Sequence, residues 1–245
     1  MADISTVDLI QIIFWFLAGC ISFYFSIGNA RVWTSISMGF FLIFLSQLYV
    51  VEKALDAPWT AYTQLEAIHY IIGTISIMVM THGFQEYYIF SRTLELGGSK
   101  QAVYLTILGL LAASAGFVFI NPEPQYTMLR NIRMIENTTW VFLSLVNLDM
   151  VRKIYLQIRD SVIARGFIAF GVVFVAIFLW KGSELYLQVY NWDTDWKLIM
   201  LNLGATVPDQ FMGRRDFSVL VHDVAGLLSG FSVGGTFIYL VRLLR

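Results

Sequence analysis

Seven apolar segments, most of them close to 20 residues long and the fifth the weakest, constrain the fold of this chain more than any other feature. A helix of about 20 apolar residues spans the hydrocarbon core of a bilayer, which is about 30 Å thick. The chain is therefore predicted to be an all-α integral membrane protein, a single seven-transmembrane helix bundle over residues 1–245. The predicted spans are Leu9–Ile27, Val32–Val51, Ala67–Phe90, Ala102–Ile120, Thr138–Val151, Gly166–Val189 and Leu220–Val241.

The composition agrees with a multi-pass membrane protein. Charged residues make up 13% of the chain, about half their usual share of a soluble domain. The chain has no basic block, so nucleic acid is not an expected partner. The single cysteine, Cys20, excludes an intrachain disulfide.

The distribution of Lys and Arg predicts the orientation of the bundle. The loops after the first, third and fifth spans, together with the C-terminal tail, carry more of these residues than the loops on the other side. By the positive-inside rule, the N-terminus is expected outside and the C-terminus inside a cytoplasmic-type membrane. The lipid bilayer is thus the first expected partner.

A stripe of glycines marks the last span. His222, Gly226, Gly230 and Gly234 recur every four residues and share one helix face. Glycines at this spacing let a neighbouring helix backbone approach closely, so we expect His222 to face a packed helix interface. The beginning of this pattern occurs once more, at His69 and Gly73.

A second spacing also occurs twice. Glu52 follows Gly39 by 13 residues, and Glu184 follows Gly171 by 13 residues. With the two His-x-x-x-Gly pairs, this spacing predicts a parallel internal repeat. Repeat A covers about residues 8–92, a connector helix about 102–120, and repeat B about 136–245.

The 3+1+3 arrangement resembles the plan of the SWEET sugar transporters. In such a plan the two triplets are related by an axis along the membrane normal. The resemblance is one of architecture, because the sequence motifs of that family are absent here. Seven spans with the N-terminus outside also resemble the rhodopsins, but the last span has no lysine to bind retinal.

Two Glu/His pairs form the predicted site. Counted from the inner boundary, Glu52, His69, Glu184 and His222 all fall near the outer ends of their spans. Ionisable residues inside a span are costly and tend to mark a function or a partner. Two imidazoles and two carboxylates suit a transition metal such as zinc, iron, manganese or copper.

Haem b is the second cofactor that these residues could hold. His69 and His222 would then be axial ligands, and arginines on the outer side would meet the propionates. These arginines are Arg130, Arg133, Arg214 and Arg215.

A purely structural interpretation competes with both cofactor hypotheses. Glu–His hydrogen bonds between helices are ordinary, and Lys181 would neutralise Glu184, which argues against a cationic metal. The other intramembrane polar residues have local partners or could mark a pathway: Asp149, Asn147 and His82.

Three functions follow from this reading. The first is a metal- or haem-binding subunit of a membrane redox complex, with other membrane subunits or further copies of itself as partners. The second is a small transporter with a pathway on the repeat axis. The third is a scaffold or receptor-like subunit without catalysis. No nucleophilic triad or phosphate-binding loop indicates an enzyme class.

Overall fold

Long α-helices make up nearly all of the described chain. The computed structural model describes residues 6–54, 62–95, 97–120, 126–190, 192 and 209–244. Within these ranges there is no strand. The helices are α1 (Thr6–Gly28), α2 (Thr34–Ala54), α3 (Tyr62–Thr93), α4 (Lys100–Ile120), α5 (Tyr126–Ile158), α6 (Ala164–Val189) and α8 (Asp209–Leu243), with a 3-10 turn η1 (Arg31–Trp33) before α2.

Each predicted span corresponds to one of these seven helices, and the largest difference is in α5. The sequence placed the fifth span at Thr138, but α5 begins at Tyr126. Arg130, Arg133 and Glu136 therefore belong to the helix and not to a loop. Their charges suggested a polar connection, but all three have hydrogen-bond or ion-pair partners on α6, described below.

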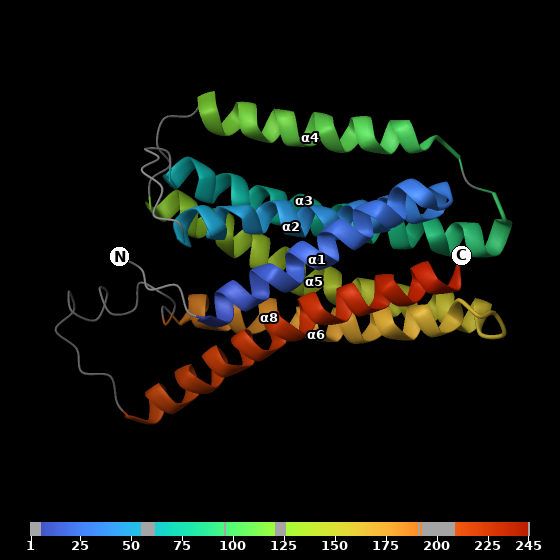
Figure 1. Ribbon diagram of the computed structural model, residues 1–245. Helices are drawn as coiled ribbons and strands as arrows, with labels where there is room; N and C mark the ends of the chain where they lie inside the picture. The colour runs from blue at the N-terminus through green and yellow to red at the C-terminus, as the bar shows by residue number, and fades with distance from the viewer. Residues whose placement is uncertain are drawn as a thin grey trace.

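Five helices have the length and apolar character of a membrane span: α1, α3, α4, α6 and α8. The chain is thus an all-helical, multi-pass membrane-type protein. The other two helices, α2 and α5, run alongside these five in the same bundle (Figure 1). The orientation relative to the two sides of a membrane stays a prediction.

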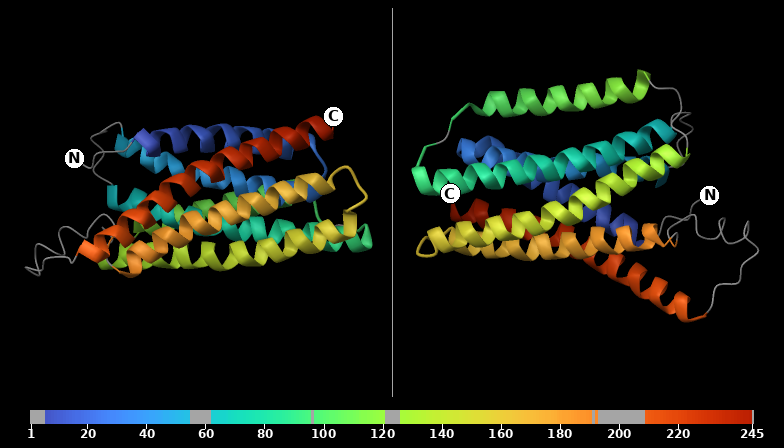
Figure 2. Two further views of the ribbon diagram at one scale, coloured as in Figure 1. Left: turned by 90° about the horizontal axis from the view of Figure 1, so that it is seen from below. Right: turned by 180° about the vertical axis from the view of Figure 1, so that it is seen from behind.

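Six helices form a closed ring, and α4 lies outside it. Around the ring each helix packs on the next in the order α1, α2, α3, α5, α6, α8, and α8 returns to α1. The helix α4 packs mainly on α3 and stands apart from the bundle in Figures 1 and 2. Lys100 donates to the carbonyl oxygens of Ser26 and Ile27 at 3.2 and 3.0 Å, which attaches the start of α4 to the end of α1.

The ring consists of two three-helix units, α1–α3 and α5, α6 and α8. In Figure 1, α1, α3, α5 and α8 all begin at the same end of the bundle, which we call the N-end. The neighbours within and between the units are those that a parallel repeat requires. The repeated spacing is packed differently, however. A Cβ on Gly39 would lie 2.2 Å from Met80 Cγ, whereas one on Gly171 would have only an ordinary contact with Val151. The repeat therefore stays a prediction.

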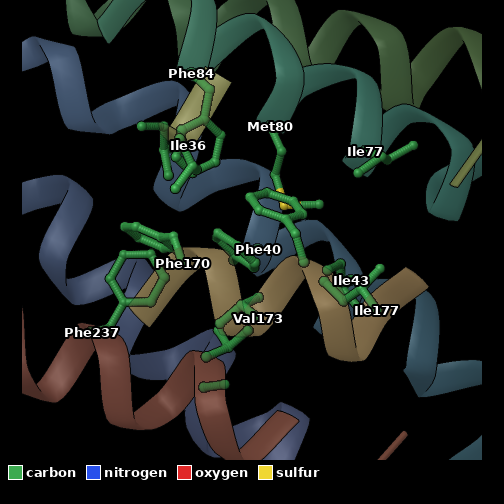
Figure 3. Close-up of a cluster of buried hydrophobic side chains, with 14 of the residues drawn as sticks. Ile36, Phe40, Ile43, Ile77, Met80, Phe84, Phe170, Val173, Ile177 and Phe237 are labelled. Atoms are coloured by element: carbon green, nitrogen blue, oxygen red, sulfur yellow. The ribbon is translucent and has the colours of Figure 1, made fainter. Parts of the chain in front are cut away.

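The middle of the ring is filled by aromatic side chains. Phe40, Phe84, Phe170, Phe174 and Phe237 are fully buried there, and the distances between neighbouring ring centroids are 5.2 to 6.3 Å. Figure 3 labels Phe40, Phe84, Phe170 and Phe237 of this cluster, together with the surrounding aliphatic residues. Each such aromatic pair adds about 0.5–1.5 kcal/mol beyond the area it buries. This cluster fills the centre of the ring in the middle of the bundle, so no open channel runs through the described part of the ring from its N-end.

The glycine stripe of α8 lies against α1, and the close helix contact that its spacing predicted is confirmed. A Cβ on Gly226 would lie 2.4 Å from Gln11 Oε1, and one on Gly230 would lie 3.0 Å from Phe14 Cβ. Gly73 makes the equivalent contact between α3 and α5, because a Cβ there would lie 2.3 Å from Glu136 Oε1. Both glycines that follow a histidine thus leave room for a polar side chain of the neighbouring three-helix unit.

Gly39 tests the close packing of α2 on α3. Its Cβ would also lie 2.8 Å from the backbone nitrogen of Met80, which cannot move as a side chain can. We expect Gly39→Ala to destabilise the protein by about 1–3 kcal/mol through overpacking. Gly109→Ala on α4 is the control, because no atom lies within 4 Å of its added Cβ, and alanine favours a helix. Detergent unfolding followed by circular dichroism measures both; equal stability of the two variants would contradict the packing.

Candidate functional site

A buried lysine joins two glutamates between α5 and α6. Lys181 Nζ lies 3.2 Å from Glu136 Oε1 and 3.1 Å from Glu184 Oε2. It also donates to Asn137 Oδ1 at 3.4 Å. An ammonium group has three N–H donors, so these three oxygens account for all of them.

Arg133 and Gln188 extend this network along the same two helices. Arg133 Nε donates to Glu184 Oε1 at 3.1 Å. Asn137 Nδ2 donates to Gln188 Oε1 at 3.3 Å, and Gln188 Nε2 donates to the carbonyl of Arg130 at 3.1 Å. The helices α5 and α6 are therefore joined by polar contacts over several turns.

The charges of this network balance. Two cations, Arg133 and Lys181, face two carboxylates, Glu136 and Glu184, and at most 19% of any of the four side chains is exposed. Burying one of these charges alone would cost several kcal/mol, which mutual attraction and hydrogen bonds offset. One oxygen, Glu136 Oε2, is buried and has no hydrogen-bond partner among the described atoms.

A polar cavity of about 130 Å³ lies beside the network. Both three-helix units contribute to its wall: α1 and α2 supply Gln11, Ile12 and Gln47, α3 supplies His69, and α6 and α8 supply Trp180, Lys181, Glu184 and His222. Three of the four residues predicted to form a site, namely His69, Glu184 and His222, thus line one cavity. The side chain of the fourth, Glu52, lies outside the described residues, so its place in the site stays a prediction.

Hydrogen bonds fix the proton on His222. The indole Nε1–H of Trp180, which can only donate, lies 3.1 Å from His222 Nε2. His222 Nε2 is therefore the accepting nitrogen, and Nδ1–H donates to Asp223 Oδ1 at 3.1 Å. Glu184 Oε2 is 3.9 Å from Nε2, too far for a hydrogen bond. Both ring nitrogens of His222 are thus used by protein groups.

The partner of His69 fixes its proton in the same way. His69 Nδ1 lies 2.6 Å from the carbonyl oxygen of Ser46. A carbonyl only accepts, so Nδ1 of His69 carries a proton. The cavity is thus lined by two imidazoles that both donate from Nδ1 to an oxygen of the protein.

These donors do not fit a transition metal. His222 would have to leave Trp180, and Glu184 already accepts from Lys181 and Arg133. A metal cation would also meet the positive charges of Lys181 and Arg133 at short range. Among the described residues, no group of three or more His, Cys, Asp or Glu is arranged to hold a metal.

The space does not fit haem b either. Pockets that enclose whole organic ligands are usually about 300–1,000 Å³, and this cavity is about 130 Å³. A porphyrin held by His69 and His222 would need the space that Gly73 and Gly226 leave beside them. That space is filled by the side chains of Glu136 and Gln11. The residues around this cavity therefore fit neither a transition metal nor haem b.

The four arginines predicted to meet haem propionates have other surroundings. Arg133 pairs with Glu184, Arg130 donates to the carbonyl of Gln188 at 2.6 Å, and Arg215 donates to the carbonyl of Trp192 at 3.1 Å. Arg214 is exposed at the start of α8. The structure does not gather them around one site.

The remaining predicted polar residues lie away from the cavity. His82 is exposed over 66% of its side chain and is 3.4 Å from Glu86, the local pair that the i,i+4 spacing suggested. Asp149 pairs with Lys153 at 2.6 Å on the exposed side of α5. Asn147 is fully buried and donates to Thr81 at 3.0 Å, which links α5 to α3.

Sequence reasoning missed Glu136 and the cavity glutamines, although α5 and α6 carry a recognisable signal. Arg133, Glu136 and Asn137 share one face of α5, at spacings of three and four residues. The polar residues of α6 follow the same rule: Lys181, Glu184 and Gln188. Two complementary polar stripes on successive helices predict a paired interface, provided that α5 is extended back to Tyr126.

No protein-family model and no curated protein sequence matches this chain.

Lys181 tests the charge network. We expect Lys181→Met to destabilise the protein by about 3–5 kcal/mol, because Glu136 loses its cation while it stays buried. Adding Glu136→Gln should restore a large part of that loss, because the remaining pair of Arg133 and Glu184 is neutral. Detergent unfolding of the three proteins measures this coupling.

Lys153→Met is the matched control. It also breaks a Lys–carboxylate pair, with Asp149, but about half of each side chain is exposed. Exposed pairs contribute little, so no measurable loss is expected. Equal losses for Lys153→Met and Lys181→Met, or no recovery in the double variant, would contradict the network.

Proposed function

We propose that this membrane protein binds a small, uncharged polar solute in the cavity between its two three-helix units. The observation that carries the proposal is the lining of the cavity, in which hydrogen-bonding side chains from five helices meet around one space. Binding sites for small molecules are typically spaces on which a few hydrogen-bonding groups converge in this way.

The charge balance argues for an uncharged solute. Lys181 and Glu184 line the cavity, but each is already neutralised by the other and by the neighbours Glu136 and Arg133. An anion or a cation in the cavity would bring a net charge into a neutral, buried set, which is costly. The amides of Gln11 and Gln47, which both donate and accept, suit hydroxyl or amide groups.

The volume argues for a small solute. About 130 Å³ is the space of roughly four water molecules at about 30 Å³ each. Solutes of about four to six non-hydrogen atoms, such as acetamide or glycerol, have the size and hydrogen-bonding groups that this lining requires.

Transport of the same solute is the second candidate. The specific observation in its favour is that both three-helix units line the cavity, as in transporters whose substrate lies between repeats. Passage would require the aromatic cluster below the cavity to separate. Uptake into liposomes distinguishes transport from binding alone.

Ligand-dependent melting tests the binding proposal. We expect acetamide or glycerol, at ten times the dissociation constant, to raise the melting temperature by about 3–6 °C, because a ligand that binds only the folded state stabilises it. Acetate and guanidinium, similar in size but charged, should have no comparable effect. Gln47→Leu should remove the increase.

Gln85→Leu is the control, because Gln85 is exposed on α3 and lies outside the cavity. It should respond to the solutes as the unaltered protein does. Stabilisation by acetate or guanidinium instead, or the same response from Gln47→Leu, would overturn the proposal.

A further inference from the structure

A long apolar groove lies on the outer surface of the ring between α6 and α8. In Figures 1 and 2 the first half of α8 diverges from α6 toward the N-end. The groove there has a volume of about 840 Å³. Its walls include Phe178, Gly182 and Tyr186 of α6 and Phe217 and Val221 of α8. It is separate from the central cavity, and none of its residues lines both.

The length of the groove matches one leaflet of a bilayer. Along α6 it extends from Phe178 to Tyr190, which is 12 residues or about 18 Å of helix. Half of a hydrocarbon core of about 30 Å is about 15 Å. A single acyl chain, running along the helices from the membrane surface toward the midplane, has this length.

Aromatic residues mark the membrane surface at one end of the groove. The ring centroids of Tyr186 and Tyr190 are 4.8 Å apart, and those of Tyr190 and Trp192 are 5.0 Å apart. Tyr and Trp gather at the level of lipid headgroups. This end of the groove therefore lies where the phosphate of a lipid would be.

Arg214 supplies a positive charge at the same end. It lines the groove and is exposed. Its neighbours Arg215 and Asp216 pair with each other at 3.4 Å, and within the described residues no carboxylate pairs with Arg214. A guanidinium beside an apolar, leaflet-length groove complements a lipid phosphate.

We propose that the groove between α6 and α8 holds one acyl chain of an anionic phospholipid, whose headgroup phosphate binds Arg214. The aromatic residues Tyr186 and Tyr190 flank the glycerol region of the lipid. The site is independent of the solute cavity, because it faces the bilayer and uses other side chains.

Native mass spectrometry of the full chain tests this lipid site. The protein is released from nanodiscs of equal parts phosphatidylglycerol and phosphatidylcholine, and the bound lipids are counted. We expect one retained phosphatidylglycerol. Arg214→Gln should lower its preference over phosphatidylcholine about fivefold, the effect of one cation near an anionic headgroup.

Gly182→Leu should prevent retention of either lipid, because its side chain would extend into the groove. The added Cβ itself has only an ordinary contact, 3.9 Å from Val141, so the helix is not displaced. Arg165→Gln, at the opposite end of the bundle, and Gly235→Leu, where nothing lies within 4 Å, are the controls and should retain lipid normally.

Three results would overturn the proposal. Equal retention of both lipids would remove the role of Arg214. Unchanged retention in Arg214→Gln and Gly182→Leu would place the lipid elsewhere. A retained quinone, or no retained molecule, would mean that the groove has another occupant. Arg214 is exposed, so its variant is expected to fold and the test holds even if Gly182→Leu fails to fold.

Discussion

The salt bridges of Lys181 are the interaction on which the rest of this structure depends. One ammonium group, 3.2 and 3.1 Å from two buried carboxylates, makes it possible for α5 and α6 to bury four charges at their interface. Glu136 in turn fills the space that Gly73 leaves on α3. Without this network α5 would be too polar for its place in the ring, and the ring would not close between its two halves.

The network also fixes the chemistry of the cavity beside it. Because Lys181 and Glu184 satisfy each other, the cavity has polar walls but no unbalanced charge. Trp180, next to Lys181 in sequence, stacks on Trp15 with ring centroids 6.1 Å apart and sets the tautomer of His222. The aromatic cluster begins farther along the helices. Its member Phe174 lies seven residues before Lys181 on α6, which is about 10 Å at the rise of an α-helix. The molecule thus has a polar compartment near its N-end and an apolar middle, which suits binding better than an always-open pathway.

Much of the fold could be predicted from the sequence, because most of the spans are long, apolar and bounded by polar residues. The stripe of Gly226 and Gly230 correctly indicated a close helix contact, and its resemblance to His69 and Gly73 led to two residues of the cavity. The partners of these glycines could not be predicted. Gly226 accommodates Gln11 and Gly73 accommodates Glu136, because helix order around the ring decides which side chain fills each space. Glu136 also fell outside the predicted fifth span, where a charge suggested a loop.

Nitrogen-15 NMR of the histidine side chains tests the central claim most directly. The chain has three histidines, so single substitutions assign each signal. The account predicts that both His69 and His222 carry a proton on Nδ1, and that Nε2 of His222, which accepts from Trp180, carries none. Addition of acetamide or glycerol should shift the imidazole signals of His69, which lines the cavity, and leave those of the exposed His82 unchanged. An unprotonated Nδ1 at either cavity histidine, a proton on Nε2 of His222, or a solute response at His82 alone would contradict it.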